Sequence, residues 1–295
     1  MSVMYSFFLT GPMKNNFKNY CLYCKRAVMQ VPVHFVMGFF VDTIASRWWD
    51  QFQRLPWPDE LAMSLVAYTH GNNEYVRKQR RTIMRYINLS YVIYFRNISS
   101  QVQLRFPSEF NLIQAGLVTE DELVRYALTA PYNRAGHYSV PITWAQNIIL
   151  QMRGEGSIKS DTDADCLLKL AVDFRKQIGG IVCYDLLPVP LVYTQVATIL
   201  TYSFTLSLIF SWQFMGEENA GLYIPIFELL QVIFYVGWLK VSEGLINPLG
   251  EDEDDYDICD MIERNMHISY HIVDEMYDRV QPLSRGVVLD TFAKD

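Results

Sequence analysis

The chain has 295 residues, of which 51% are hydrophobic and 19% are charged, and its formal net charge is −7. This length allows one or two domains, and the acidic balance argues against a nucleic-acid partner. The five cysteines form an odd and scattered set, which is a poor disulfide framework and is typical of a reducing cytosol.

The first apolar stretch is "AVMQVPVHFVMGFFV", which begins at residue 27 and carries no charge. It is shorter than the roughly 20 residues that span a bilayer, so it predicts a pore-lining or buried helix over residues 27–45. Val31, Phe35 and Phe39 follow i, i+4, i+8 spacing and share one face of that helix. A stripe of this kind is usually part of a packed core, and the residues alone leave that alternative open.

Residues 46–185 form a charged region with helical patterning and weak strand-like alternation. A long helical pattern starts at Tyr75 and ends at Pro107, because proline cannot continue a helix. The sequence "TEDE" from Thr119 to Glu122 predicts a capping box at the start of a further helix. Basic residues cluster early in this region, so the positive-inside rule predicts a helical cytosolic region.

Two apolar runs follow. Residues 186–216 contain no charged residue, and residues 222–239 contain only Glu228. About 20 such residues suffice to span a bilayer as a helix. The short link between the runs has no Lys or Arg, which favours an outside location. We therefore predict a hairpin of two transmembrane helices over residues 186–241, with both of its ends facing the cytosol.

The sequence "EDEDDYD" at residues 251–257 places six acids in seven positions soon after the second apolar run. Two interpretations are open: a solvated acidic loop and a divalent-cation site. The EF-hand pattern is absent, since no glycine follows Asp252 at the needed spacing. We assign residues 242–258 to this acidic segment and residues 259–295 to a C-terminal cytosolic helix and tail. With no Ser-His-Asp, P-loop or HExxH arrangement, no enzymatic activity is expected.

Several long motifs carry a family resemblance. They are "RWWDQFQRLPWPD" (47–59), "IQAGL" (113–117), "PLVYTQV" (190–196), "IPIFELLQVIFYVGWLKV" (224–241) and "LINPLGEDEDD" (245–255). In these motifs and in their order the chain resembles the bestrophins, which are calcium-activated anion channels built as pentamers around one central pore. The resemblance implies an all-α, multi-pass membrane subunit of a homopentamer, surrounded by lipid, in the plasma membrane. Chloride is then the permeant ion, and calcium is the regulatory ion.

The resemblance also implies where the pore is narrow. Val31, Phe35 and Phe39 match the three apolar residues that line the hydrophobic neck of bestrophins. Thr162 is the nearest match to a second constriction, the cytosolic aperture. An ordinary helix N-cap is an equal alternative for Thr162.

The resemblance implies a calcium clasp in the acidic segment. Asp252 and Asp255 match the two clasp carboxylates, and Gly244 and Asn247 match the residues that contribute backbone carbonyls. The family more often has Gln where this chain has Gly244. A backbone ligand tolerates that change, because the carbonyl is common to all residues.

The N-terminal segment of residues 1–26 departs from the family pattern. Bestrophins normally begin with a transmembrane helix before the neck helix, and their extreme N-terminus adds a carbonyl to the clasp. Residues 1–16 are too few to supply both, so an incomplete product or a shortened family member is expected. A shortened member favours a non-conducting regulatory subunit that assembles with full-length bestrophins, as the alternative to a conducting homopentamer.

Overall fold

The structure is a computed structural model that describes residues 11–30, 32–129, 136–211 and 226–277. These residues fold into helices, and the β-type pairing among them is an isolated bridge between Thr69 and Ile158. The all-α class predicted from the sequence is therefore confirmed for the described part of the chain.

The chain divides into two compact units. The first unit combines residues 1–54 with 183–256, and the second combines residues 55–182 with 257–295. Each unit is thus built from two stretches that are distant in the sequence. The first unit carries the apolar runs and the acidic run, and the second carries most of the charged helical region.

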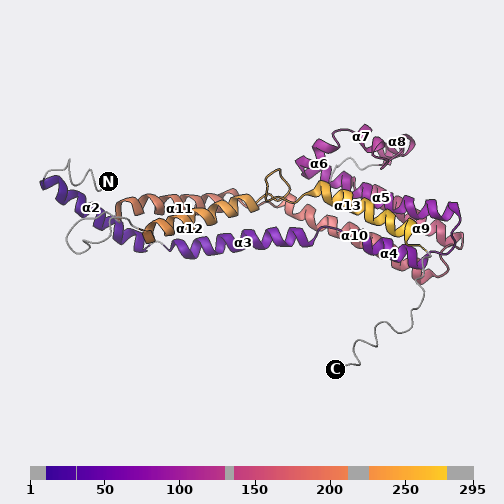
Figure 1. The fold of residues 1–295 in the computed structure, drawn as a ribbon, viewed down its shortest axis with the longest axis horizontal. Coiled ribbons are helices and arrows are strands. Elements are labelled where there is room, and N and C mark those ends of the chain that lie inside the picture. The colour runs from indigo at the N-terminus through magenta and orange to yellow at the C-terminus, as the bar shows by residue number, and fades with distance from the viewer. Residues whose placement is uncertain (1–10, 31, 130–135, 212–225, 278–295) are drawn as a thin grey trace, which may run out of the picture. The chain divides into compact units, whose positions relative to one another are not determined.

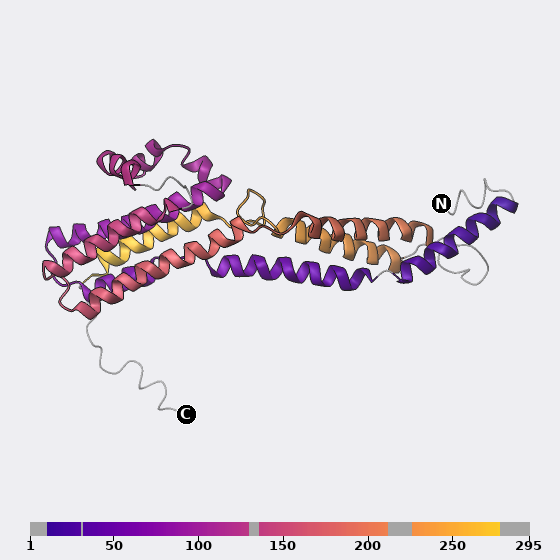
Figure 2. The same cartoon turned by 180° about the vertical axis from the view of Figure 1, so that it is seen from behind.

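Four complete helices lie in the described part of the first unit. They are α2 (Gly11–Gln30), α3 (Val33–Gln53), α11 (Leu191–Ser211) and α12 (Ile226–Leu245). Helices α3, α11 and α12 lie side by side, and α11 also packs against α2 (Figures 1 and 2). Their shared core consists of Val33, Met37, Phe40, Ile44, Ala197, Phe204, Leu208 and Leu239.

A break at Pro32 separates α2 from α3. The backbone of Pro32 (φ −81°, ψ 58°) is not helical, and its carbonyl accepts hydrogen bonds from the N–H groups of Phe35 and Val36 at 3.1 and 3.2 Å. Proline has no N–H and disfavours a helical backbone at the residue before it. The helix predicted over residues 27–45 is therefore divided: α2 ends before the proline, and α3 begins after it and extends beyond residue 45.

The helices of the first unit differ in their capacity to cross a membrane. Among the described residues, α11 is the one helix that is long and apolar enough by itself, and α2 and α3 qualify only together as one span bent by 43°. Helix α12 does not qualify within its described bounds, because Lys240 and Glu243 join Glu228 there. Of the two described helices of the predicted hairpin, α11 thus meets the length and composition expected of a membrane span, and α12 does not.

Helix α5 (Glu74–Ile98) is the centre of the second unit. Helices α9 (Ser139–Gly154) and α13 (Ile258–Tyr270) pack along it, as both views show. The other described helices are α4 (Asp59–Tyr68), α6 (Ser100–Arg105), α7 (Glu109–Gln114), α8 (Glu120–Thr129), α10 (Asp161–Leu186) and the π-helix η3 (His271–Glu275).

Helix α5 is shorter than the sequence pattern predicts. It begins where the Asn73 side chain accepts a hydrogen bond from the Val76 N–H at 2.8 Å. It ends at Ser99, whose backbone is extended (φ −111°, ψ 123°). The pattern predicted to run unbroken to Pro107 is therefore divided into α5 and the short helix α6.

The capping box predicted at Thr119 is confirmed. The Glu122 N–H donates to Thr119 Oγ1 at 3.3 Å, and the Thr119 N–H donates to Glu122 Oε2 at 2.9 Å. The same carboxylate accepts two hydrogen bonds of 2.6 Å from Arg85 and one of 2.6 Å from the Tyr86 hydroxyl. Burial acts to raise the pKa of Glu122, but these donors outweigh it and lower the pKa to about 2. Glu122 therefore joins α8 to α5 as well as capping its own helix.

Candidate functional site

Helix α3 presents an exposed aromatic face. Phe35 and Phe39 are 60% and 57% exposed, and their ring centroids lie 4.7 Å apart in an edge-to-face arrangement. His34, Gly38 and Asp42 line the same shallow hollow on this face. Large apolar side chains left free on a helix indicate that another surface, or a pore axis, covers or faces them.

The opposite face of α3 explains why the phenylalanines stay free. Val33, Met37, Phe40 and Ile44 are at most 3% exposed and form the α3 part of the shared core. They follow helical spacing, so they occupy one side of the helix and leave the other side outward. The core-stripe alternative for Phe35 and Phe39 does not hold within the subunit.

Val31, the third predicted neck residue, lies outside the described residues. Thr162 is exposed in the first turn of α10, where its N–H donates to Ser160 Oγ at 3.1 Å. Ser160 therefore provides the side-chain cap of this helix, which leaves the Thr162 hydroxyl available for another role.

The acidic segment is an ordered loop in the first unit. Backbone hydrogen bonds close it, from the Tyr256 N–H to the Pro248 carbonyl at 2.9 Å and from the Asp255 N–H to the Asp252 carbonyl at 3.1 Å. Asp255 Oδ2 accepts a further hydrogen bond from the Asp252 N–H at 2.8 Å. The two predicted clasp carboxylates are therefore held in one turn. We call residues 247–256 the acidic loop.

Gly250 allows this loop to close. A Cβ at this position would lie 2.7 Å from Asp255 Oδ2 and 3.2 Å from Asn247 Nδ2. Its N–H donates to the Asn247 carbonyl at 3.3 Å. The glycine is therefore needed for close approach, and it brings the predicted ligand residues Asn247 and Asp255 together.

Asp255 has the features of a cation ligand. Its Oδ1 is buried and has no hydrogen-bond partner among the described residues, and burial raises the pKa of this carboxyl. An unpaired buried carboxylate oxygen is unfavourable unless a cation or a donor meets it. Asp252 is exposed, and Gly244 lies in the last turn of α12. Two carboxylates in one turn, one of them with an unpaired buried oxygen among the described residues, are the kind of donors that calcium binds.

The predicted set depends on carbonyl ligands. The described residues contain no group of three or more His, Cys, Asp or Glu side chains arranged to hold a metal ion. Calcium takes six to eight oxygen ligands and accepts backbone carbonyls and water among them. Asp252 and Asp255 are only two carboxylates, so a calcium ion at the predicted residues would also need oxygen ligands such as backbone carbonyls and water.

An aromatic anchor beside the acidic loop was not predicted from the sequence. The Tyr256 hydroxyl donates to the backbone carbonyl of Trp48 on α3, and its ring lies 5.3 Å from Trp48 and 5.5 Å from Phe52. Burial raises the pKa of Tyr256, so the hydroxyl remains a donor at neutral pH. Trp48, the partner in this contact, lies in the "RWW" motif at residues 47–49.

A second missed residue is Arg47, also on α3. Its Nη2 atom donates to the carbonyls of Tyr184 and Leu187 at 2.6 and 2.7 Å, and its guanidinium lies 4.8 Å from the Tyr184 ring centroid. These carbonyls lie where α10 ends, and such groups otherwise lack donors. Arg47 therefore fixes the chain between α10 and α11 onto α3.

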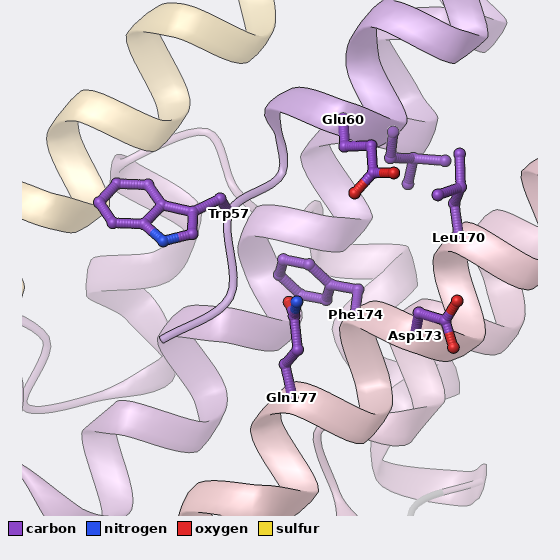
Figure 3. A pocket seen from close by; sticks show the side chains of 7 residues that line it. Trp57, Glu60, Leu170, Asp173, Phe174 and Gln177 are labelled. Carbon is purple, nitrogen blue, oxygen red and sulfur yellow. The ribbon is translucent and has the colours of Figure 1, made fainter. Parts of the chain in front are cut away.

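A concave site in the second unit is too small for an organic ligand. It is lined by Trp57 and Glu60 near the start of α4 and by α10 side chains that include Leu170 and Phe174 (Figure 3). The cavity volume of about 20 Å³ has room for about one water molecule. It therefore carries no binding function of its own.

Comparison with known proteins identifies relatives over nearly the whole chain. A family model described as "Bestrophin, RFP-TM, chloride channel" matches residues 1–275. Bestrophin-3 of Homo sapiens is 39% identical over 300 residues, which cover 99% of this chain and 44% of the relative. Bestrophin-2a of Homo sapiens is 39% identical over 297 residues, 98% of this chain and 58% of the relative. The chain thus spans about half the length of these relatives.

Solved structures show a similar fold. A point mutant of a bacterial bestrophin homolog from Klebsiella pneumoniae has a TM-score of 0.66 and 16% sequence identity, covering 84% of this chain and 86% of that chain. A second crystal structure, described as a membrane protein, also has a TM-score of 0.66 and 16% identity, at 92% and 93% coverage. At this identity the likeness concerns the fold.

Proposed function

The chain belongs to the bestrophin family, and on that basis we propose that it is a subunit of a calcium-activated chloride channel. In this proposal, five copies of the chain form a homopentamer around one central pore, and anions pass through the pore passively. The observation that carries this proposal is the two-sided helix α3, in which Phe35 and Phe39 are exposed while the opposite face is buried. Copies of this helix around an axis place both phenylalanines in the pore.

The first unit provides the membrane part of the proposed channel. Apolar side chains lie exposed along α11 and α12, among them Leu191, Ile199, Phe227 and Phe234. Exposed apolar surface of this extent is favourable in lipid and unfavourable in water. In the proposed topology the chain crosses the plasma membrane several times, and residues 46–185 and 259–295 lie in the cytosol.

Hydrophobic rings are the proposed gate. Phe35 and Phe39 form two of them, and Val31 forms a third. A narrow apolar constriction blocks ions by excluding water, and it conducts when it widens enough to be wetted. Thr162 is the proposed residue of a second, polar constriction at the cytosolic exit.

Calcium is the proposed regulator, held by the carboxylates of Asp252 and Asp255 and the carbonyls of Gly244 and Asn247. A calcium ion at this place would add positive charge and would draw several oxygen ligands to within about 2.3–2.6 Å. The buried Oδ1 of Asp255, which has no hydrogen-bond partner in the described part of the chain, supports this assignment. The other acids of the loop raise the local concentration of cations.

Chloride flux from liposomes that contain only this purified chain tests the proposal. We expect calcium to increase the flux, and we expect Asp252→Ala and Asp255→Ala each to raise the calcium concentration required. Glu253→Ala is the matched control, because it removes an exposed loop charge that is not a proposed ligand. Unchanged calcium dependence in both aspartate variants would contradict the clasp.

The same assay separates the alternative function. A chain that assembles in liposomes but passes no chloride, and that changes the flux through a full-length bestrophin when the two are mixed, is a non-conducting regulatory subunit. Flux from the chain alone excludes that alternative.

A further inference from the structure

Tyr256 makes one hydrogen bond within the acidic loop and one to helix α3. Its backbone N–H closes the loop on the Pro248 carbonyl at 2.9 Å, and its hydroxyl donates to the Trp48 carbonyl. The residue is only 6% exposed. A single residue therefore takes part both in the loop closure and in a contact with α3.

The contact on α3 is specific and well enclosed. The Tyr256 ring packs against Trp48 and Phe52, which are one helical turn apart near the end of α3. Main-chain carbonyls within a helix are fixed in direction, because the helix backbone is rigid. A shift of the tyrosine therefore acts on the helix rather than on a mobile side chain.

The other end of this path is the exposed aromatic face of α3. Phe39 lies nine residues before Trp48 on the same helix, so about 14 Å of continuous helix separates the two. Rigid helices carry displacement between sites. No other element is needed between the tyrosine contact and the proposed gate.

The acidic loop supplies the input. Asp255, whose Oδ1 is buried without a partner among the described residues, is the residue immediately before Tyr256. A cation bound by this carboxylate is therefore held by the residue next to the tyrosine in the chain. We propose that the hydrogen bond from the Tyr256 hydroxyl to Trp48 transmits occupancy of the acidic loop to the pore helix α3. This inference rests on the proposed function. Tyr256 acts in it as a positioning residue, because it does not itself bind the ion.

Tyr256→Phe isolates the hydrogen bond, since phenylalanine keeps the ring packing against Trp48 and Phe52. We expect direct calcium binding to stay within about twofold of wild type. We expect the calcium concentration for half-maximal chloride flux to rise about fivefold, the effect of one lost hydrogen bond of ordinary strength. Tyr235→Phe is the matched control, because Tyr235 packs edge-on against Phe204 in the α11–α12 pair.

Hydrogen exchange of the full chain in lipid nanodiscs gives a readout that does not require conduction. Calcium is added to wild type, Tyr256→Phe and Tyr235→Phe, and exchange is followed in peptides that cover residues 45–54 and 247–257. We expect calcium to slow exchange in the acidic loop of all three proteins. We expect it to slow exchange at the end of α3 in wild type and Tyr235→Phe only.

The outcomes separate this inference from the proposed function. Equal calcium protection of α3 in wild type and Tyr256→Phe overturns the role of the hydroxyl. An equal loss of calcium binding and of flux response in Tyr256→Phe also overturns it, because the residue then serves only to shape the site. Absence of calcium protection in the acidic loop of wild type overturns calcium regulation itself, and the inference with it.

Discussion

Replacing Gly250 with alanine displaces the carboxylate that the proposed clasp depends on. The new Cβ would stand 2.7 Å from Asp255 Oδ2, whereas ordinary contacts begin at 3.4 Å, so the oxygen has to move by about 0.7 Å. That oxygen now accepts from the Asp252 N–H at 2.8 Å. A shift of this size lengthens the donor–acceptor separation to as much as about 3.5 Å, which is beyond the range of a good hydrogen bond.

The magnitude follows from the hydrogen bond that is lost. A hydrogen bond to a charged group contributes about 1.5–3 kcal/mol, and partial exposure of Asp255 favours the lower end. A loss of about 1.5 kcal/mol corresponds to roughly tenfold weaker calcium binding. We therefore expect Gly250→Ala to raise the calcium dissociation constant about tenfold without unfolding the protein.

Isothermal titration of the purified chain with calcium measures this effect. Gly244→Ala is the matched control, since a Cβ at Gly244 meets nothing within 4 Å and its backbone carbonyl is retained. We expect Gly244→Ala to bind calcium like wild type. Equal calcium affinity in Gly250→Ala and wild type would refute the close-approach argument and with it the placement of Asp255 in the clasp.

Two further predictions concern the gate and the second unit. Phe35→Ala combined with Phe39→Ala is expected to leave the channel conducting without calcium, because the apolar rings are lost; patch recordings that still show calcium dependence would contradict this. Glu122→Gln is expected to lower the free energy of unfolding by about 1–2 kcal/mol at neutral pH, because Arg85 then stays half-buried without its charged partner. The pKa of Glu122 is lowered to about 2 from a usual 4.5, so its stabilising effect is present above pH 4.5 and is lost as the pH falls towards 2. Thermal unfolding across this range should show a smaller pH dependence in Glu122→Gln than in wild type, and equal dependence would argue against the Arg85 contact.

Local signals in the sequence predicted local structure well. The all-α class follows from apolar periodicity, and the Thr119–Glu122 capping box follows from two residues three positions apart. Family membership follows from the motifs, and the family model confirms it. Each of these features depends on a short stretch of sequence, so its residue types alone are enough to predict it.

Other features depend on residues that only the fold brings together. Trp48 and Tyr256 are 208 residues apart, and Arg47 and Tyr184 are 137 apart, so neither contact has a local signal. The need for Gly250 appears only when the loop closes on Asp255. The end of α5 at Ser99 was not predicted for a related reason, since serine is not a residue that breaks helices by itself.

Because the two faces of α3 differ in burial, substitutions at neighbouring positions of this helix have different effects. Phe40 is 1% exposed in the core, whereas its neighbour Phe39 is 57% exposed. A polar substitution at Phe40 therefore destroys the packing between helices and removes the protein from the cell through quality control. The same substitution at Phe39 is expected to leave a folded, abundant protein and to change only the proposed pore. Variants one position apart would then act through loss of the protein at Phe40 and through loss of the proposed gate at Phe39.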